Sequence, residues 1–263
     1  MKLFDSAAHP TITGKWGFNK RIRGQVSSFK KLDKQMKKTN FFKACAIGLH
    51  SYEKYNHKKF IKECNKFKGL IPIAGFNPKQ SSKRIIKEIN LIKSLGFKGI
   101  KLHPRISNFT LEHPKLDCVL EAAEKNNLVV MLCCYVGSGY NEYAAKDFLI
   151  SLVNLFKKRK KLKTILLHGG CQRLLDFSEF VKLRPKNFLL DLSMTIMRYQ
   201  GSSVDLDIKY LFKKLDQRIC IGSDFPEYSL EEVKKRFLKL AIGINEKKKK
   251  NIAFNNLNKF FYK

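Results

Sequence analysis

The sequence lacks the features that mark several specialised classes of protein. It has no uninterrupted apolar run near the roughly 18 residues that a membrane-spanning helix needs, and residues 1–5 carry no apolar signal-peptide segment. Its 7 cysteines are an odd set without a CxxC pair, which argues against a disulfide framework or a zinc finger. We therefore expect a soluble, cytoplasmic protein with reduced thiols and no membrane insertion.

Acidic residues are also scarce: the chain has 22 Asp and Glu but 53 Lys and Arg, which gives a formal net charge of +31. A surplus of this size raises the question of a nucleic acid or an anionic membrane surface as partner. The lysines, however, are spread over nearly every helix-like segment, as in residues 157–161 and 247–250, and do not alternate with aromatic residues in one stripe. We interpret them as solvated helix faces and expect no specific nucleic-acid partner.

What the sequence does contain is a repeated alternation of short apolar runs and helix-period segments, a pattern typical of βα units around a parallel sheet. There are eight such runs, and from the second onward their starts are 24 to 35 residues apart, close to the roughly 30 residues of one βα unit. We predict an α/β fold, a single (βα)8 TIM barrel domain over residues 1–263. The runs begin near Lys2, Ala44, Leu70, Gly99, Val129, Thr164, Phe188 and Ile219.

The segments between and after these runs agree with a barrel. Ser229 followed by Glu232 predicts a capping box, and so a helix directly after the eighth strand. Residues 10–23 form a longer, irregular connection that contains the sole tryptophan, Trp16, and we interpret it as a loop over the barrel mouth. The last segment predicts a C-terminal helix that closes one end of the barrel, because apolar residues recur there at helical spacing: Ile252, Phe254, Leu257 and Phe261.

The ends of parallel barrel strands converge on one mouth, so polar residues after each run are the candidates for chemistry. An aspartate within a strand, such as Asp191, is costly unless paired, and we expect it to pair with a basic neighbour or to orient a mouth residue. No cysteine has a partner spacing that singles it out as a nucleophile, and we interpret the vicinal Cys133 and Cys134 as core thiols. The candidates are Asp5, His9, Lys101, His103, Arg105, Tyr135, His168, Asp191, Ser193, Ser223 and Asp224.

Five motifs, in their order and spacing, resemble the landmarks of the amidohydrolase-related family within the amidohydrolase superfamily. They are FDSAAHP at 4–10, GFKGIKLHP at 96–104, LLHGG at 166–170, IGSDFP at 221–226 and NNLNKFF at 255–261. The resemblance spans the chain and implies a TIM barrel with metal ligands at a first-strand pair of histidines, at a histidine after the fifth or sixth strand, and at an eighth-strand aspartate that doubles as general base. Mapped by motif, these positions are Ala7 with His9, then His168 and Asp224.

The chain departs from the family pattern at two positions. Ala7 has no lone pair for a metal, and the fifth-strand histidine is replaced within residues 133–135. Two versions of the site stay open. In one, a divalent zinc or manganese ion on His9, His168 and Asp224 lowers the pKa of bound water towards ~7. In the other, which needs no metal, Asp224 acts as base on water and His168 as acid or oxyanion stabiliser.

The resemblance and the positive side chains near the mouth predict a hydrolase that activates water to split a small, anionic ester, lactone or amide. Asp224 and His168 are the expected catalytic residues. The alternatives are a decarboxylase of the same family, or a catalytically degenerate barrel that serves as a binding protein. We expect a small-molecule substrate and a homodimer. The expected substrate-binding residues are Lys101, His103, Arg105 and Tyr135.

Overall fold

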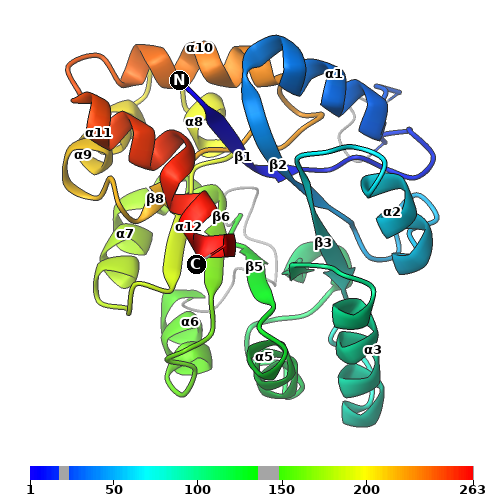
Figure 1. Cartoon of the computed structure of the whole chain (residues 1–263). Coiled ribbons are helices and arrows are strands. Elements are labelled where there is room, and N and C mark those ends of the chain that lie inside the picture. The colour runs from blue at the N-terminus through cyan, green and yellow to red at the C-terminus, as the bar shows by residue number, and fades with distance from the viewer. Residues whose placement is uncertain (18–23, 136–147, 263) are drawn as a thin grey trace.

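Eight parallel strands form a barrel in the computed structural model, which describes residues 1–17, 24–135 and 148–262 (Figure 1). The strands pair in chain order, and two hydrogen bonds link the segment that follows β8 back to β1: Ser6 N to Ile221 O at 3.0 Å and Asp224 N to Ala7 O at 2.8 Å. The predicted (βα)8 TIM barrel is thereby confirmed. The strands are β1 (Leu3–Ala8), β2 (Phe41–Ile47), β3 (Leu70–Phe76), β4 (Gly99–Leu102), β5 (Val129–Cys133), β6 (Thr164–Leu167), β7 (Phe188–Asp191) and β8 (Ile219–Cys220).

Helices surround the strands (Figure 1), and their buried apolar residues join those of the strands in one core cluster. Side-chain caps fix where several begin: Ser229 and Glu232 form the predicted capping box of α10, and Ser28 and Ser81 cap α1 and α3. The helices are α1 (Phe29–Thr39), α2 (His57–Cys64), α3 (Ser82–Ser94), α4 (Pro104–Ser107), α5 (Leu116–Lys125), α6 (Phe148–Phe156), α7 (Leu174–Lys182), α8 (Thr195–Arg198), α9 (Val204–Lys214), α10 (Leu230–Leu240), α11 (Glu246–Lys250) and α12 (Asn256–Tyr262).

The core has two parts because successive strand residues point to opposite faces of the sheet. Alternate residues of the strands fill the barrel interior, among them Ile47, Met131 and Leu167. The other residues of the strands pack against the helices, among them Ile100 and Leu132. The parity of a strand residue thus decides whether its side chain faces the barrel interior, which opens at the mouth, or the surrounding helices.

The C-terminal segment closes the end of the barrel opposite the mouth, as predicted. Leu257 and Phe260 of α12 belong to the interior cluster, and the Phe254 and Phe261 rings lie 6.0 Å and 6.1 Å from the ring of Phe4. The first part of the predicted helix is, however, a π-helical turn, Asn251–Asn255, which lies between α11 and α12. Directly after this turn, Asn256 Nδ2 donates to the carbonyls of Asp216 and Ile219, at 2.7 Å and 2.8 Å.

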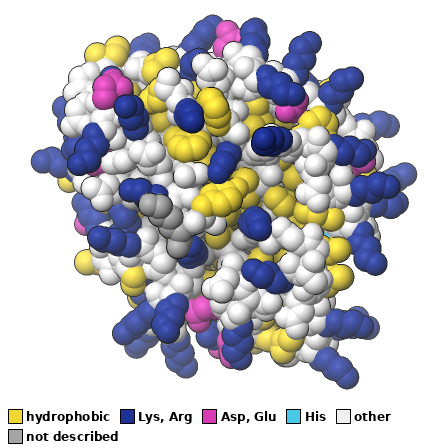
Figure 2. All heavy atoms as spheres, in the orientation of Figure 1, with side chains coloured by type: hydrophobic (Ala, Val, Ile, Leu, Met, Phe, Trp, Pro, Cys, Tyr) yellow, Lys and Arg dark blue, Asp and Glu magenta, His cyan; other side chains and the backbone are white. Residues whose placement is uncertain are grey.

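Lysine and arginine side chains are scattered over the face shown in Figure 2 and around its rim, and few acidic side chains lie among them. They occur over several helices and form no single stripe in this view. None of the helices in the described ranges has the length and apolar character needed to cross a membrane.

Candidate active site

The backbone turns into the left-handed region at the ends of β6 and β8, at His168 with φ 66° and at Asp224 with φ 53°. A residue with a β-carbon pays roughly 1–2 kcal/mol for this conformation. Gly170, in the tight turn that follows His168, cannot be replaced without movement, because a β-carbon there would lie 2.1 Å from Cδ2 of Phe177. Strain of this kind persists where the surroundings over-determine a side-chain position, as at functional sites.

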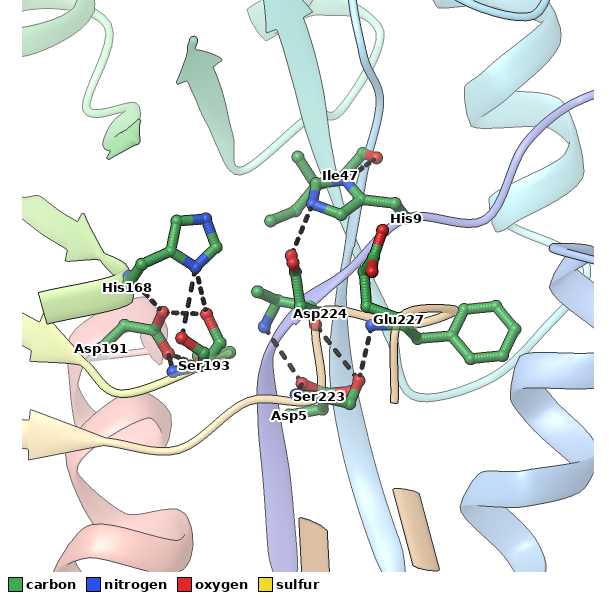
Figure 3. A network of polar contacts seen from close by, with 12 residues as sticks. Asp5, His9, Ile47, His168, Asp191, Ser193, Ser223, Asp224 and Glu227 are labelled. Atoms are coloured by element: carbon green, nitrogen blue, oxygen red, sulfur yellow. Dashed lines mark hydrogen bonds and ion pairs between the residues drawn. The ribbon is translucent and has the colours of Figure 1, made fainter. Parts of the chain in front are cut away.

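His9 and Asp224 form a buried pair at the mouth. His9 Nε2 lies 3.3 Å from Asp224 Oδ1, and its Nδ1 lies 3.2 Å from the carbonyl oxygen of Ile47 (Figure 3). Both partners are acceptors, so a ring with a proton on each nitrogen satisfies both contacts. Burial alone would raise the pKa of Asp224, but His168, His9 and Lys101 together bring it well below its usual value. Asp224 is therefore a carboxylate.

Asp5 holds the loop that carries Asp224. Its Oδ1 accepts from Ser223 N at 2.8 Å and Ala7 N at 3.1 Å, and its Oδ2 accepts from Ser223 Oγ at 2.5 Å. Burial raises the pKa of Asp5 to about 7, although the hydrogen bonds from Ser223 and Ala7 act in the opposite direction. Asp5 thus holds the backbone amides of Ala7 and Ser223, and with them the loop that carries Asp224.

Asp191 orients the mouth residue His168, which was one of the two roles predicted for it. The other predicted role, pairing with a basic neighbour, is not seen in the described ranges. The Asp191 carboxylate accepts from His168 N at 3.1 Å, from Ser193 N at 3.0 Å, and from the hydroxyls of Ser193 and Ser6. The Ser193 hydroxyl gives its proton to Asp191, so its oxygen accepts from His168 Nδ1 at 3.1 Å (Figure 3). The Ser193 carbonyl oxygen lies 3.3 Å from the same Nδ1.

These contacts fix which nitrogen of His168 carries a proton. Nδ1 faces two acceptors and holds its proton there, so Nε2 is the nitrogen that can take up and release one. Burial alone would lower the pKa of His168, but Asp224 and Cys133 raise it above its usual value. Although His168 and Asp224 influence each other in this way, no hydrogen bond joins them among the described residues.

Cys133 is the site residue that sequence reasoning missed. It ends β5 with the interior parity of Val129 and Met131, and its thiol interacts with the rings of both His103 and His168. Burial alone would raise the pKa of the Cys133 thiol, but the two rings bring it well below its usual value. Burial raises the pKa of five other cysteines, and among the described thiols a lowered value is found for Cys133 alone.

His103 faces the pocket side and anchors a turn as well. Its Nδ1 accepts from Ile106 N at 3.3 Å, as the cap of α4, so the ring proton is on Nε2. Burial lowers the pKa of His103 to about 4, with Lys101 and Arg105 contributing and Cys133 opposing. His103 is thus a neutral donor towards Cys133.

Lys101 brings an unpaired charge into the same cluster. The side chain is 1% exposed, and Nζ has no hydrogen-bond partner within the described parts of the chain. Its charge lowers the pKa values of Asp224 and His103, which places it among the side chains of the mouth. A buried ammonium without an acceptor is costly, and an anionic ligand would relieve that cost.

Two arginines and a tyrosine line the edge of the mouth. The guanidinium carbons of Arg105 and Arg198 lie 4.9 Å and 5.6 Å from the centre of the Tyr135 ring. That ring meets the His168 ring edge-on, at 6.3 Å between centres. Tyr135, Arg105 and Lys101 therefore lie near His168, as the predicted set of binding residues requires, while their role in binding stays a prediction.

Trp16 covers the other side of the mouth. Its ring stacks on His9 at 6.0 Å between centres, and its Nε1 donates to Glu227 Oε1 at 3.4 Å. The side chain is buried. The expectation that the first loop reaches over the mouth holds for Trp16; residues 18–23 of that loop lie outside the described residues.

The side chains that the family pattern assigns to a metal share the mouth, but each has protein partners. Over residues 1–17, 24–135 and 148–262, no three or more His, Cys, Asp or Glu side chains are grouped so that they could hold a metal ion. Asp224 is engaged with His9, whereas His168 directs Nδ1 at Ser193. The nearby ammonium of Lys101 would also repel a divalent cation. Ala7 and the ammonium of Lys101 thus weigh against a family-type metal centre, and metal binding by His9, His168 and Asp224 stays a prediction.

Comparisons with known proteins agree with this architecture. The model of a family described as amidohydrolase matches residues 20–253. No protein among those of curated function matches the sequence. Because the solved structures that match are less than 25% identical to the chain, their likeness shows the fold alone.

Three of these structures show how far the likeness extends. An uncharacterized TIM-barrel protein from Bordetella bronchiseptica is 15% identical, with a TM-score of 0.81, over 99% of this chain and 98% of that one. A probable 2-pyrone-4,6-dicarboxylic acid hydrolase from Acinetobacter baumannii, with citric acid bound, is 16% identical, with a TM-score of 0.74, over 99% of both chains. A 2,6-dihydroxybenzoate decarboxylase complexed with 2,6-dihydroxybenzoate is 16% identical, with a TM-score of 0.70, over 99% of both chains.

Proposed function

Because the chain belongs to the amidohydrolase family, we propose that it is a hydrolase that splits a small, anionic ester, lactone or amide at the mouth of a single barrel domain, residues 1–263. Members of the family are hydrolases or decarboxylases. One observation carries the proposal: His168, held by Asp191 and Ser193, shares the mouth with the Asp224 carboxylate and with the ammonium of Lys101, which has no hydrogen-bond partner among the described residues. Addition of water to an acyl carbon needs a proton acceptor and a charge for the developing oxyanion, and this group supplies both.

His168 is the proton carrier of this proposal. Its Nε2 is the nitrogen left available by the contacts of Nδ1, and the Asp224 charge stabilises the imidazolium that forms when Nε2 takes a proton. The lowered pKa of Asp224 makes its carboxylate a weak base. We therefore assign Asp224 the task of stabilising charge and orienting water, together with its partner His9.

Positive charge at two depths suits an anionic substrate. Lys101 lies buried in the cluster and would stabilise the oxygen on which charge develops, whereas Arg105 and Arg198 flank Tyr135 and would hold a carboxylate of the substrate. The related structure described as a pyrone-dicarboxylic acid hydrolase holds citric acid, which is also a polycarboxylate. This likeness supports a substrate that carries carboxylates beside the bond that is split.

Enzymes of this family often depend on a metal ion. The chemistry proposed for this chain runs through His168 and Lys101, and elemental analysis of the purified protein tests it. We expect full hydrolysis after dialysis against a chelator. Stoichiometric zinc or manganese that is lost on His9→Ala, together with the activity, would contradict the proposed route and establish the metal-bound version.

Decarboxylation of an aromatic acid is the second candidate, since a decarboxylase with bound 2,6-dihydroxybenzoate has the same fold. A catalytically degenerate barrel fits less well, because a protein without chemistry gains nothing from strained backbone at His168 and Asp224 or from the buried ammonium of Lys101. We also expect a homodimer, which light scattering after gel filtration would test.

A panel of anionic esters, lactones and amides, run beside a panel of aromatic acids, tests the proposed function. We expect acid release from the first panel, with a loss of about 10²–10³-fold or more in His168→Gln and Asp224→Asn. Ser203→Ala, at the N-cap position of α9 where the side chain makes no cap hydrogen bond, serves as the control and should keep full activity. Carbon dioxide release from the second panel alone would establish the decarboxylase, and turnover of neither panel would establish the degenerate barrel.

A further inference from the structure

We propose that a cavity at the end of the barrel opposite the mouth binds a small molecule that carries two or three phosphate groups. This inference is independent of the proposed hydrolase function and gives the chain a second binding site. The cavity has a volume of about 630 Å³ and lies where the starts of β6, β7 and β8 meet α11 and the C-terminal segment (Figure 1). Its positive side chains are Lys163, Lys186, Arg218, Lys247 and Lys259.

The positive charges of this cavity lack acidic partners. Among the described residues, no Asp or Glu side chain lines it, and none of its five cations takes part in an ion pair. Asp216 lies close by in the sequence, but its Oδ2 accepts from Asn251 Nδ2 at 2.7 Å and its Oδ1 lies 3.8 Å from Lys248 Nζ. Because like charges around one cavity repel each other, an anion that enters it lowers the electrostatic energy.

The surroundings of these five cations differ from those of many other lysines on the surface. Several helical lysines pair with an acidic residue four positions away, as Lys37 does with Asp33 at 2.6 Å and Lys125 with Glu121 at 2.7 Å. The five cations of the cavity come instead from five separate segments, which the barrel and its C-terminal helices bring together. The shared cavity therefore distinguishes them from the general positive surface of the chain.

Arg218 contributes its charge to the cavity, but its N–H groups are engaged. The guanidinium donates to the carbonyl oxygens of Val181 at 2.7 Å, Pro185 at 2.9 Å and Phe188 at 3.0 Å. These contacts hold it at the C-terminal end of α7 and occupy the planar fork that would bind a carboxylate through two hydrogen bonds. The donors left for a ligand are ammonium groups, which bind phosphate as point charges.

The lysines of the cavity have donors to spare. Lys163 is half-buried and donates to the carbonyl oxygen of Phe260 at 2.8 Å, which leaves two of the three N–H groups of its ammonium. The side chains of Lys186, Lys247 and Lys259 are exposed. A carboxylate supplies one negative charge, whereas a phosphate group supplies about 1.5–2 at pH 7. Two or three phosphate groups therefore match the positive charge of the cavity.

The lining of the cavity suits a compact ligand better than a nucleic-acid strand. Proteins that bind single strands combine a positive groove with aromatic side chains on which the bases stack. Of the described lining residues, Phe260 is the one aromatic side chain, and it is 7% exposed. A ligand bound here would also connect the starts of three strands with α11 and α12, so it should stabilise the closed end of the barrel.

Calorimetric titration of the intact protein with inorganic triphosphate, at constant ionic strength, tests the proposal. We expect one triphosphate per chain and, at about 100 times the Kd, a rise of roughly 5–10 °C in Tm. Binding should persist in Arg105→Gln, because this substitution changes the mouth. Acetylation of lysines, followed by peptide mass spectrometry, gives a second measurement on the wild-type protein, in which triphosphate should protect the lysines of the cavity.

Two triple variants separate the cavity from the net charge of the chain. The site variant should bind triphosphate about 10–100-fold more weakly, since each exposed charge pair contributes about two- to fivefold. The control variant loses the same charge from α2 and α3 and should keep the Kd within about twofold. Thermal melts show whether both are folded. The site variant combines Lys186→Gln, Lys247→Gln and Lys259→Gln, and the control combines Lys58→Gln, Lys83→Gln and Lys87→Gln.

Five outcomes would overturn the inference. Equal weakening in the two triple variants would show that binding follows net charge alone, and loss of binding in Arg105→Gln would place triphosphate at the mouth. Citrate that binds as tightly as triphosphate would remove the preference for phosphate. An RNA homopolymer that binds more tightly than triphosphate, and is lost in the site variant alone, would establish a nucleic-acid surface instead. The fifth is a wild-type protein with neither a shift in Tm nor protected lysines.

Discussion

Replacing the buried lysine of the mouth should make the protein more stable and less active. Lys101→Met keeps the length of the side chain and removes the ammonium, which is 1% exposed and without a hydrogen-bond partner in the described structure. The attraction of Lys101 to Asp224 and its repulsion from a protonated His168 act in opposite directions, so we treat the two as cancelling. What remains is the cost of a buried donor without an acceptor.

That cost is about 1–3 kcal/mol, and Lys101→Met should raise the free energy of unfolding by this amount. For a domain of this size the gain corresponds to a rise of roughly 2–10 °C in Tm. Loss of the charge that faces the developing oxyanion should lower turnover of p-nitrophenyl acetate by about 10²–10³-fold. Urea unfolding and thermal melts measure the first effect, and nitrophenolate release measures the second.

Lys163→Met is the matched control at the opposite end of the barrel. Lys163 Nζ donates to the carbonyl oxygen of Phe260 at 2.8 Å, so this lysine has an acceptor where Lys101 has none among the described residues. This variant should lose about 0.5–1.5 kcal/mol and keep its turnover. A loss of stability in Lys101→Met as large as in the control would show that Lys101 has an acceptor in solution. Unchanged turnover in Lys101→Met would remove the lysine from the proposed chemistry.

Four further predictions concern the turn after β6, the support of the histidine, its titration and the cover of the mouth. Gly170→Ala should lower the free energy of unfolding, measured in urea, by about 2–4 kcal/mol, because φ is positive there and the new β-carbon would clash with Phe177. Gly243→Ala has a positive φ of 77° but open space around the β-carbon, so it should lower the free energy of unfolding by about 1 kcal/mol. Equal losses in the two variants would refute the clash. Asp191→Asn should lose about 2–4 kcal/mol and at least tenfold in turnover, because its amide meets four donors; full activity would show that His168 needs no support. Because the pKa of His168 is raised in the folded protein, its protonation stabilises the fold below the unfolded pKa of ~6.5, and this stabilisation is lost as the pH rises through the folded pKa. The difference in free energy of unfolding between the wild-type protein and His168→Gln should therefore be larger at about pH 5.5 than at about pH 9. Binding of an anionic ligand should change the fluorescence of Trp16, the sole tryptophan, and an unchanged spectrum on saturation would place the ligand elsewhere.

The barrel could be predicted from the sequence because parallel strands buried on both faces appear as continuous apolar runs. Six of the predicted starts, including Leu70, Gly99 and Val129, coincide with the observed ones. The second strand begins earlier than its apolar run, at Phe41, because it opens with the half-exposed Phe42 and with Lys43, which obscure the pattern. The π-helical turn near the C-terminus has no signal of this kind, since its apolar spacing is that of a helix.

The motifs predicted which histidines and aspartate reach the mouth, but not how they pair. Pairing depends on the positions of β1, β6, β7 and β8 around the ring, and this is why Asp224 contacts His9 while His168 contacts Ser193. Cys133 was missed for a different reason. In a strand that is apolar on both faces, parity alone does not tell the mouth side from the helix side, and the structure was needed to separate Cys133 from Cys134.

The surplus of positive side chains, spread over the face seen in Figure 2, bears on how quickly a substrate arrives. A small polyanion approaching such a surface is drawn in from any direction, and its capture rate is enhanced at low ionic strength. At physiological salt the field extends only about 8 Å from the surface, so the enhancement shrinks to the last steps of approach. Encounter with a carboxylate is therefore expected to slow as salt is added, while the chemical step inside the mouth, shielded from bulk ions, keeps its rate.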